Sequence, residues 1–62
     1  MQRYFAKRKE QNNLILEESD IHHIKNVMRM NINDKIEVVY DKVLYICNID
    51  NLDPLTLSVE DT

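Results

Sequence analysis

The chain has 62 residues, of which 44% are apolar and 31% charged, and its formal net charge at pH 7 is −3. This composition is typical of a folded globular domain and excludes a disordered tail, while so short a chain leaves scarcely enough room for both a core and a catalytic pocket. No apolar run approaches the roughly 20 residues that span a bilayer and no signal-peptide pattern opens the chain, so we expect a cytoplasmic protein. Cys47 has no second cysteine to pair with and is expected to be a small buried residue.

The sequence contains no glycine. Phosphate-binding loops of nucleotide hydrolases and the dinucleotide-binding fingerprint need backbone without Cβ atoms close to phosphate, so both kinds of site are excluded. Tight turns must be made by asparagine and aspartate, which tolerate positive φ better than most residues with a Cβ atom. We expect these turns at Asn12-Asn13, Asn31 to Asp34, Asp41-Lys42 and Asp50 to Pro54.

Charge is distributed unequally along the chain. Residues 1–31 carry six basic and four acidic side chains, whereas residues 32–62 carry two basic and seven acidic ones. If the protein binds phosphate groups, the first half is therefore the part that binds them.

The first predicted elements are two short strands and one helix. The strands lie at Arg3 to Phe5 and Leu14 to Leu16, and Ser19 can cap a helix that runs to about Met30. At 100° per residue the helix has two unlike faces. The apolar face comprises Ile21, Ile24, Val27 and Met28, and the polar face, offered to solvent or to a partner, comprises His22, Lys25, Asn26 and Arg29.

Three more strands follow the helix. Residues 35–41 alternate as a half-buried strand, residues 43–49 are apolar on both faces, and residues 55–60 alternate again after the Asp53-Pro54 turn. The predicted fold is mainly β with one short α-helix, arranged as a small, strongly curved sheet or an incomplete barrel. At least one sheet edge is expected to be exposed, which favours pairing with a second copy or a continuation of the chain beyond Thr62.

Two adjacent histidines raise the question of a metal site. Neighbours on a helix point about 100° apart and no third ligand lies nearby, so we expect no metal and no catalytic group. His23 is predicted to be packed, with one ring nitrogen hydrogen-bonded to backbone. His22 is either an ordinary solvated histidine or a hydrogen-bond donor to RNA phosphate or a base.

The basic side chains are either merely solvated or form a phosphate-binding patch, which requires the N-terminal strand to lie near the helix. They are Arg3, Lys7, Arg8, Lys9, Lys25 and Arg29. Tyr4, Phe5, Tyr40 and Tyr45 could stack on bases, although aromatic side chains in strands more often belong to the core.

Three segments together resemble one family. The opening Met1-Gln2-Arg3-Tyr4-Phe5, the block from His22 to Arg29 and the segment Asn33-Asp34-Lys35-Ile36 are similar to the N-terminal domain of the RsmE family of bacterial 16S ribosomal RNA uridine N3-methyltransferases. The resemblance implies a PUA-like β-barrel over residues 1–62, incomplete at its C-terminal end, that helps to hold RNA. In that family, methyl transfer belongs to a C-terminal SPOUT domain with a deep trefoil knot, which binds S-adenosylmethionine and usually dimerises. Nothing in the chain corresponds to that domain, so we expect a truncated part of a longer enzyme, inactive alone.

The resemblance also implies partners and binding residues. The partner is 16S ribosomal RNA or the small ribosomal subunit, in ribosomal RNA processing and ribosome biogenesis. The candidate RNA-binding residues that the resemblance implies are Arg3, His22, His23 and Arg29. Lys25 and the Lys7-Arg8-Lys9 loop are added for their charge alone. The alternative is an interaction module that forms a homodimer or binds another protein through its strand edges, without binding RNA.

The chain departs from the family at two turns. It has Asn33-Asp34 where the family commonly has Gly-Asp, and asparagine can adopt the same left-handed conformation. It has Asp41-Lys42 where the family favours Asp-Gly, so we expect a wider or less stable hairpin there, in an undetermined register.

Overall fold

Five strands and one short helical segment make up most of the computed structural model, which describes residues 1–61. The strands are β1 (Arg3–Glu10), β2 (Asn13–Leu16), β3 (Lys35–Tyr40), β4 (Val43–Leu52) and β5 (Leu55–Asp61). The helical segment consists of α1 (Glu18–His22) and the π-helical turn η1 (His23–Val27). The prediction of a mainly β domain with one short helix is confirmed. No described helix is long and apolar enough to cross a membrane.

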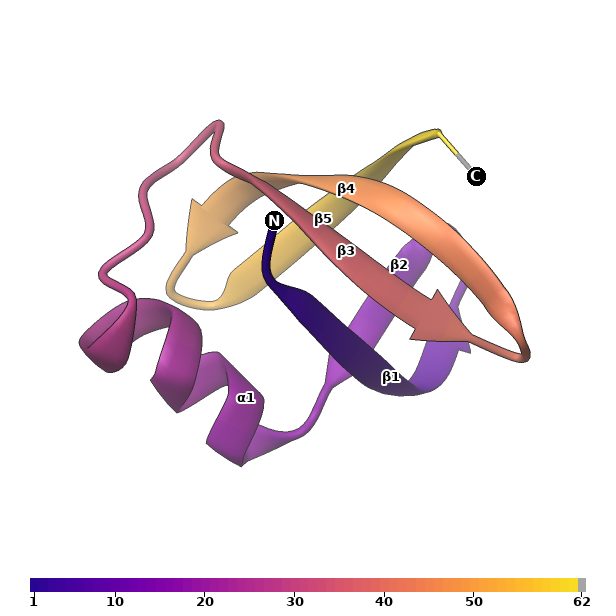
Figure 1. Ribbon diagram of the computed structural model, residues 1–62, viewed down its shortest axis with the longest axis horizontal. Coiled ribbons are helices and arrows are strands. Elements are labelled where there is room, and N and C mark those ends of the chain that lie inside the picture. Colours follow the sequence, from indigo (N-terminus) through magenta and orange to yellow (C-terminus); the bar gives the residue numbers. More distant parts are fainter. Residues whose placement is uncertain (62) are drawn as a thin grey trace.

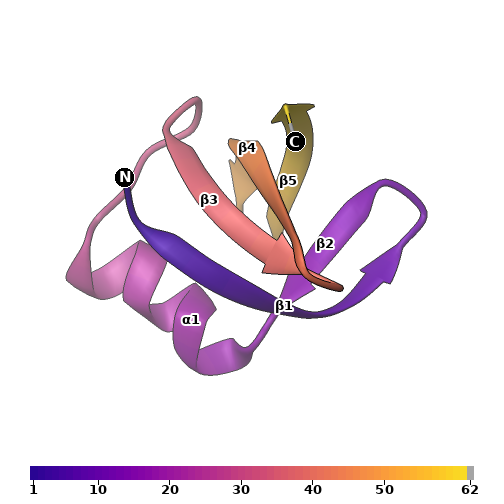
Figure 2. The same cartoon turned by 45° about the vertical axis from the view of Figure 1, so that its right-hand side comes forward.

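The strands form one sheet that curls almost into a barrel (Figures 1 and 2). The strand order is β2-β1-β3-β4-β5; β1 and β3 are parallel, and the other neighbours are antiparallel. The edge strands β2 and β5 approach each other without a ladder of backbone hydrogen bonds. The backbone N–H of Leu57 instead donates to Oδ1 of Asn13 across 3.4 Å. The barrel is therefore incomplete, as predicted, with an unsealed seam between β2 and β5.

The core lies inside the barrel. Alternate residues of the strands point inward, as the period of two in a strand requires. In β3, Ile36 and Val38 are fully buried, in agreement with the predicted alternation. The core comprises Tyr4, Leu14, Leu16, Ile24, Ile36, Val38, Cys47, Ile49 and Leu57.

Strand β1 is longer than predicted, because the basic stretch after Phe5 pairs with β2. The ladder places Ala6 opposite Leu16 and Arg8 opposite Ile15, so Lys7 is the extra residue of a β-bulge. The connecting turn lies at Gln11-Asn12, where Gln11 has φ 56°, and not at the predicted Asn12-Asn13.

The β3–β4 hairpin is tight, which corrects the expectation of a wider turn. Asp41 and Lys42 both have positive φ, 51° and 65°. Two such residues give the turn whose twist matches the flanking strands, and glycine-free sequences can form it at a cost in strain. The register is regular from Tyr40 opposite Val43 to Lys35 opposite Asn48. Asn33, at φ 76°, adopts the left-handed conformation that the sequence predicts.

The helix differs from its prediction at both ends. Its N-cap is Glu17, without a side-chain cap, so the assignment of Ser19 as the cap is wrong. After His22 the chain widens into a π-turn, in which the N–H of Met28 donates to the carbonyl of His23. The helical segment ends at Val27, short of the expected Met30.

The π-turn also changes which side chains are buried. A π-turn holds one more residue than an α-turn and so rotates the residues that follow. Ile24 is fully buried, but Val27 is 60% exposed and Met28 39% exposed. The predicted apolar face is therefore correct at Ile24 and wrong at Val27 and Met28.

Candidate nucleic-acid interface

A hydrogen bond between side chains joins the N-terminal strand to the helical segment. Oη of Tyr4 lies 2.9 Å from Nδ1 of His23, and the two rings meet edge to face at 5.9 Å. Burial, and secondarily the carboxylate of Asp20, raises the pKa of Tyr4, so its hydroxyl keeps its proton and can donate to His23. The predicted packing of His23 is confirmed, but its partner is a side chain and not the backbone. This contact places β1 beside the helix (Figure 2), which a joint basic surface requires.

Three of the candidate residues lie on the polar side of the helical segment or just after its end. His22 is exposed, and the Asn26 amide donates to its Nδ1 across 3.1 Å. Lys25 Nζ lies 3.6 Å from Oδ1 of Asp53 in the β4–β5 turn. Arg29 is exposed at φ 52°, just beyond the helix, and forms no ion pair within residues 1–61.

Strand β1 carries the other cations. Arg3 Nε lies 3.1 Å from Oε1 of Glu37 on β3, and Arg8 pairs with Glu10 on its own strand. Lys7, in the bulge, is exposed. Exposed ion pairs such as these contribute only about 0 to 1 kcal/mol, so phosphate groups can replace the carboxylates at little cost.

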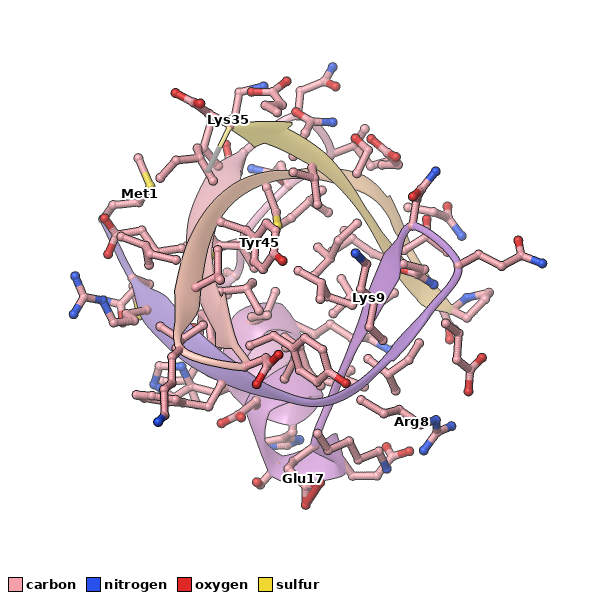
Figure 3. The ribbon with its side chains drawn as sticks, turned by 90° about the vertical axis from the view of Figure 1, so that its right-hand side faces the viewer. Met1, Arg8, Lys9, Glu17, Lys35 and Tyr45 are labelled. Carbon is pink, nitrogen blue, oxygen red and sulfur yellow. The ribbon has the colours of Figure 1, made fainter. Side chains whose placement is uncertain are left out.

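The candidate residues do not converge on one point. Lys25 faces the β4–β5 turn and Arg3 faces β3, whereas Arg8 lies near the β1–β2 turn, about 16 Å from Arg3 along an extended strand. In Figure 3 the Arg8 side chain points away from the barrel. An extended nucleic-acid backbone fits such a spread better than a single phosphate does, and the role of each residue in RNA binding stays a prediction.

Phe5 lies on the surface, although aromatic side chains in strands more often belong to the core. Its side chain is 63% exposed, on the outer face of the sheet opposite Val39, which in turn lies opposite Leu44. An exposed aromatic ring two residues from Arg3 is a surface on which a base can stack. Strand alternation could have revealed it, because Tyr4 and Phe5 cannot both point into the core.

A pocket of about 570 Å³ lies at the end of the barrel opposite the helix. Its lining residues are Lys9, Glu10, Gln11, Asn12, Asn13, Tyr45, Leu57, Ser58 and Val59. Figure 3 looks into this end and shows Lys9 and Tyr45 pointing toward each other, with Lys9 Nζ at 5.8 Å from the centroid of the Tyr45 ring. The expectation that the chain has scarcely enough room for a pocket is therefore wrong.

The other candidate reactive groups are the Cys47 thiol and the side chains that could bind a metal ion. Burial, and secondarily the carboxylate of Glu60, raises the pKa of Cys47 to about 11, so the thiol stays protonated and a poor nucleophile. Within residues 1–61, histidine, cysteine and carboxylate side chains do not gather in groups of three that could hold a metal ion.

The comparison with known families agrees with this architecture. The family described as "RNA methyltransferase PUA domain" matches residues 16–61, from the end of β2 to the end of β5. The match leaves out β1, and with it Arg3, Lys7 and Arg8. No curated protein matches the chain significantly. Since the match spans most of the sequence, the chain belongs to the family of RNA methyltransferase PUA domains.

Proposed function

We propose that this domain holds ribosomal RNA for an S-adenosylmethionine-dependent methyltransferase of the RsmE family, which methylates N3 of a uridine in 16S RNA during ribosome biogenesis in the cytoplasm. The observation that carries the proposal is the family match over residues 16–61. The exposed cations on β1 and on the helical segment support it, because phosphate groups are the dominant ligands of such side chains in RNA complexes. The finer assignment to uridine N3 rests on the resemblance of the His22 to Arg29 block.

In this proposal the domain positions the RNA, and methyl transfer takes place in another domain. Arg3, Lys25 and Arg29 are expected to contact phosphates, which fix register and orientation without reading sequence. The resemblance assigns S-adenosylmethionine and methyl transfer to a separate catalytic domain. In the pocket described above, the Lys9 ammonium disfavours the sulfonium cation of that cofactor.

The proposal is tested by the binding of a 16S ribosomal RNA fragment to the 62-residue chain as the salt concentration is raised. We expect affinity to fall linearly on a logarithmic scale, because bound cations release the counterions of the RNA. Lys25→Glu combined with Arg29→Glu should reduce affinity at least tenfold while the circular dichroism spectrum stays unchanged. Lys42→Glu reverses an exposed charge in the β3–β4 turn, outside the candidate surface, and serves as the matched control.

Two outcomes would count against the proposal in different ways. Equal affinity of the double variant and the parent would show that the helical surface is not the binding surface. A concentration-dependent dimer that ignores RNA would favour the alternative, an interaction module that pairs through the edges of β2 and β5.

A further inference from the structure

The β-bulge in β1 decides where the Lys9 side chain goes. Along an unbroken strand, Lys9 would share the outer face with Phe5. The extra residue Lys7 reverses the alternation, so Lys9 lies opposite Leu14, whose side chain is 3% exposed in the core. Two residues directly opposite each other in a ladder point to the same face. The bulge therefore turns Lys9 to the inner side of the sheet at the open end of the barrel, where it stays exposed, while Arg8 points outward (Figure 3).

Tyr45 meets Lys9 at the mouth of the barrel. It lies opposite Val38, which is fully buried, so its ring also points inward. Unlike Val38, Tyr45 is only partly buried, because it stands near the open end where no helix covers the interior. Its ring, together with Leu57 and Val59, forms the apolar part of the pocket.

The rest of the pocket is polar and both donates and accepts hydrogen bonds. The amides of Gln11 and Asn12 in the β1–β2 turn and of Asn13 at the start of β2 line the pocket. Ser58 on β5 also lines it, but its hydroxyl donates to Oδ1 of Asp50 across 3.0 Å. Asn13 uses its Oδ1 to accept the N–H of Leu57, which leaves its NH₂ group for a ligand. The carboxylate of Glu10 pairs with Arg8, and Lys9 forms no ion pair within residues 1–61. The positive charge of Lys9 is therefore available to an anion.

We propose that this pocket binds one unpaired nucleotide of an RNA chain, with the base against Tyr45 and a phosphate at Lys9. A nucleotide combines what the pocket offers: a planar aromatic face, an edge of hydrogen-bond donors and acceptors, and one anionic group. An acidic peptide would call for more than one cation, and an apolar ligand would leave the amides unpaired. The volume of about 570 Å³ lies within the range of small-molecule sites.

Binding requires a small rearrangement within the pocket. In the structure the Lys9 ammonium covers the Tyr45 ring. A cation over an exposed ring is held less strongly than a stacked base, so the base replaces the ammonium on the ring and Lys9 moves to the phosphate. The site deepens the proposed function, on which it rests, because it adds the capture of a single-stranded nucleotide to the positioning of phosphates.

The test is a titration of the isotopically labelled 62-residue chain, followed by two-dimensional NMR, with three probes: uridine, uridine monophosphate and hexauridylate. We expect hexauridylate to shift the amide signals of residues 9–13 and of Tyr45 and Ser58, to bind more tightly than the monophosphate, and uridine to bind most weakly. Tyr45→Leu and Lys9→Gln should each weaken hexauridylate binding about tenfold. Tyr45→Phe, which keeps the aromatic ring, should bind as the parent does and shows that the stacking face is what matters.

A separate pair of variants tests whether the charge of Lys9 binds the phosphate. In Lys9→Gln the difference in affinity between uridine and its monophosphate should disappear, whereas Lys42→Gln, which removes an exposed charge elsewhere, should preserve it. Signal shifts confined to other surfaces, or unchanged affinity in Tyr45→Leu, would overturn the pocket assignment. Binding of the monophosphate without binding of hexauridylate would overturn the assignment to RNA.

Failure of this proposal is distinguishable from failure of the proposed function. If the pocket is wrong and the function right, the 16S fragment still binds in a salt-dependent manner and Lys25→Glu with Arg29→Glu still weakens it. If the function is wrong, the 16S fragment does not bind the parent chain at all.

Discussion

The two ends of the barrel are built from the same sheet and differ in what covers them. At one end the helical segment lies across the opening, Ile24 is fully buried and Tyr4 is bonded to His23 (Figure 1). At the other end the β1–β2 turn leaves a pocket lined by amides, Lys9 and Tyr45. The two ends therefore differ in cover: the helical segment closes one end over Ile24, and the other end is open at the pocket.

The largest expected effect comes from the closed end. Ile24→Ala removes a fully buried side chain and should lower the free energy of unfolding by about 3 kcal/mol. Urea denaturation followed by circular dichroism measures the change. Val27→Ala, in the same helical segment but 60% exposed, should change it by less than about 0.5 kcal/mol. Similar losses in both variants would contradict the idea that the closed end carries the stability.

The second largest expected effect is a pH dependence of stability that comes from the buried thiol of Cys47. The pKa of Cys47 is raised from 9.0 to about 11, so the folded state holds this proton to a higher pH than the unfolded state does. The free energy of unfolding is therefore unaffected by this group below pH 9 and falls by about 1.4 kcal/mol per pH unit as the pH rises from 9 toward 11.

Urea titrations at several pH values measure this slope. In Cys47→Ala the thiol contribution is absent, so stability should fall less steeply over the same interval. Identical slopes in the parent and in Cys47→Ala would show that the thiol is not desolvated as the structure places it.

The two ends of the barrel can be compared by removing one tyrosine hydroxyl from each. Tyr4→Phe leaves Nδ1 of His23 without its partner and should cost about 1 to 2 kcal/mol of unfolding free energy. Tyr45→Phe, at the open end, removes a hydroxyl that makes no side-chain hydrogen bond within residues 1–61 and should cost almost nothing. Thermal unfolding of the two variants measures both losses of unfolding free energy. A larger loss in Tyr45→Phe than in Tyr4→Phe would contradict the proposed difference between the two ends.

The smallest expected effect is a gain in stability. Lys42 has φ 65° in the β3–β4 turn, a conformation that strains any residue with a Cβ atom. Lys42→Gly should relieve this strain and raise the free energy of unfolding by about 1 kcal/mol. Lys42→Ala keeps the Cβ atom and should give no such gain, so equal gains in both variants would point to the lost charge as the cause.

Much of the fold could be predicted because strand periodicity is a local signal. The alternation of residues 35–41 and 55–60 correctly located β3 and β5, and Asn33 correctly marked a left-handed turn. The length of β1 could not be predicted, because its basic second half becomes a strand only through pairing with β2. The exposure of Val27 could not be predicted either, because a regular helical period contains no sign of the π-turn.

The candidate site was predictable as a set of residues and not as a surface. Charge identified Arg3 and Lys25, but their partners Glu37 and Asp53 come from other strands and turns that only the folded chain brings near. Lys9 shows the limit most clearly. Its direction depends on a bulge, and a bulge is defined by the register of two strands.

The parallel pairing of β1 with β3 has a consequence for how the domain is made in the cell. Arg3 on β1 lies opposite Glu37 on β3, and 34 positions separate them in the chain. A ribosome that adds about 5 to 20 residues per second needs about 2 to 7 s to synthesise the chain between them. Throughout that interval β1 has only the short β2 to pair with, and its longer-range partner β3 becomes available only after the helical segment has been synthesised.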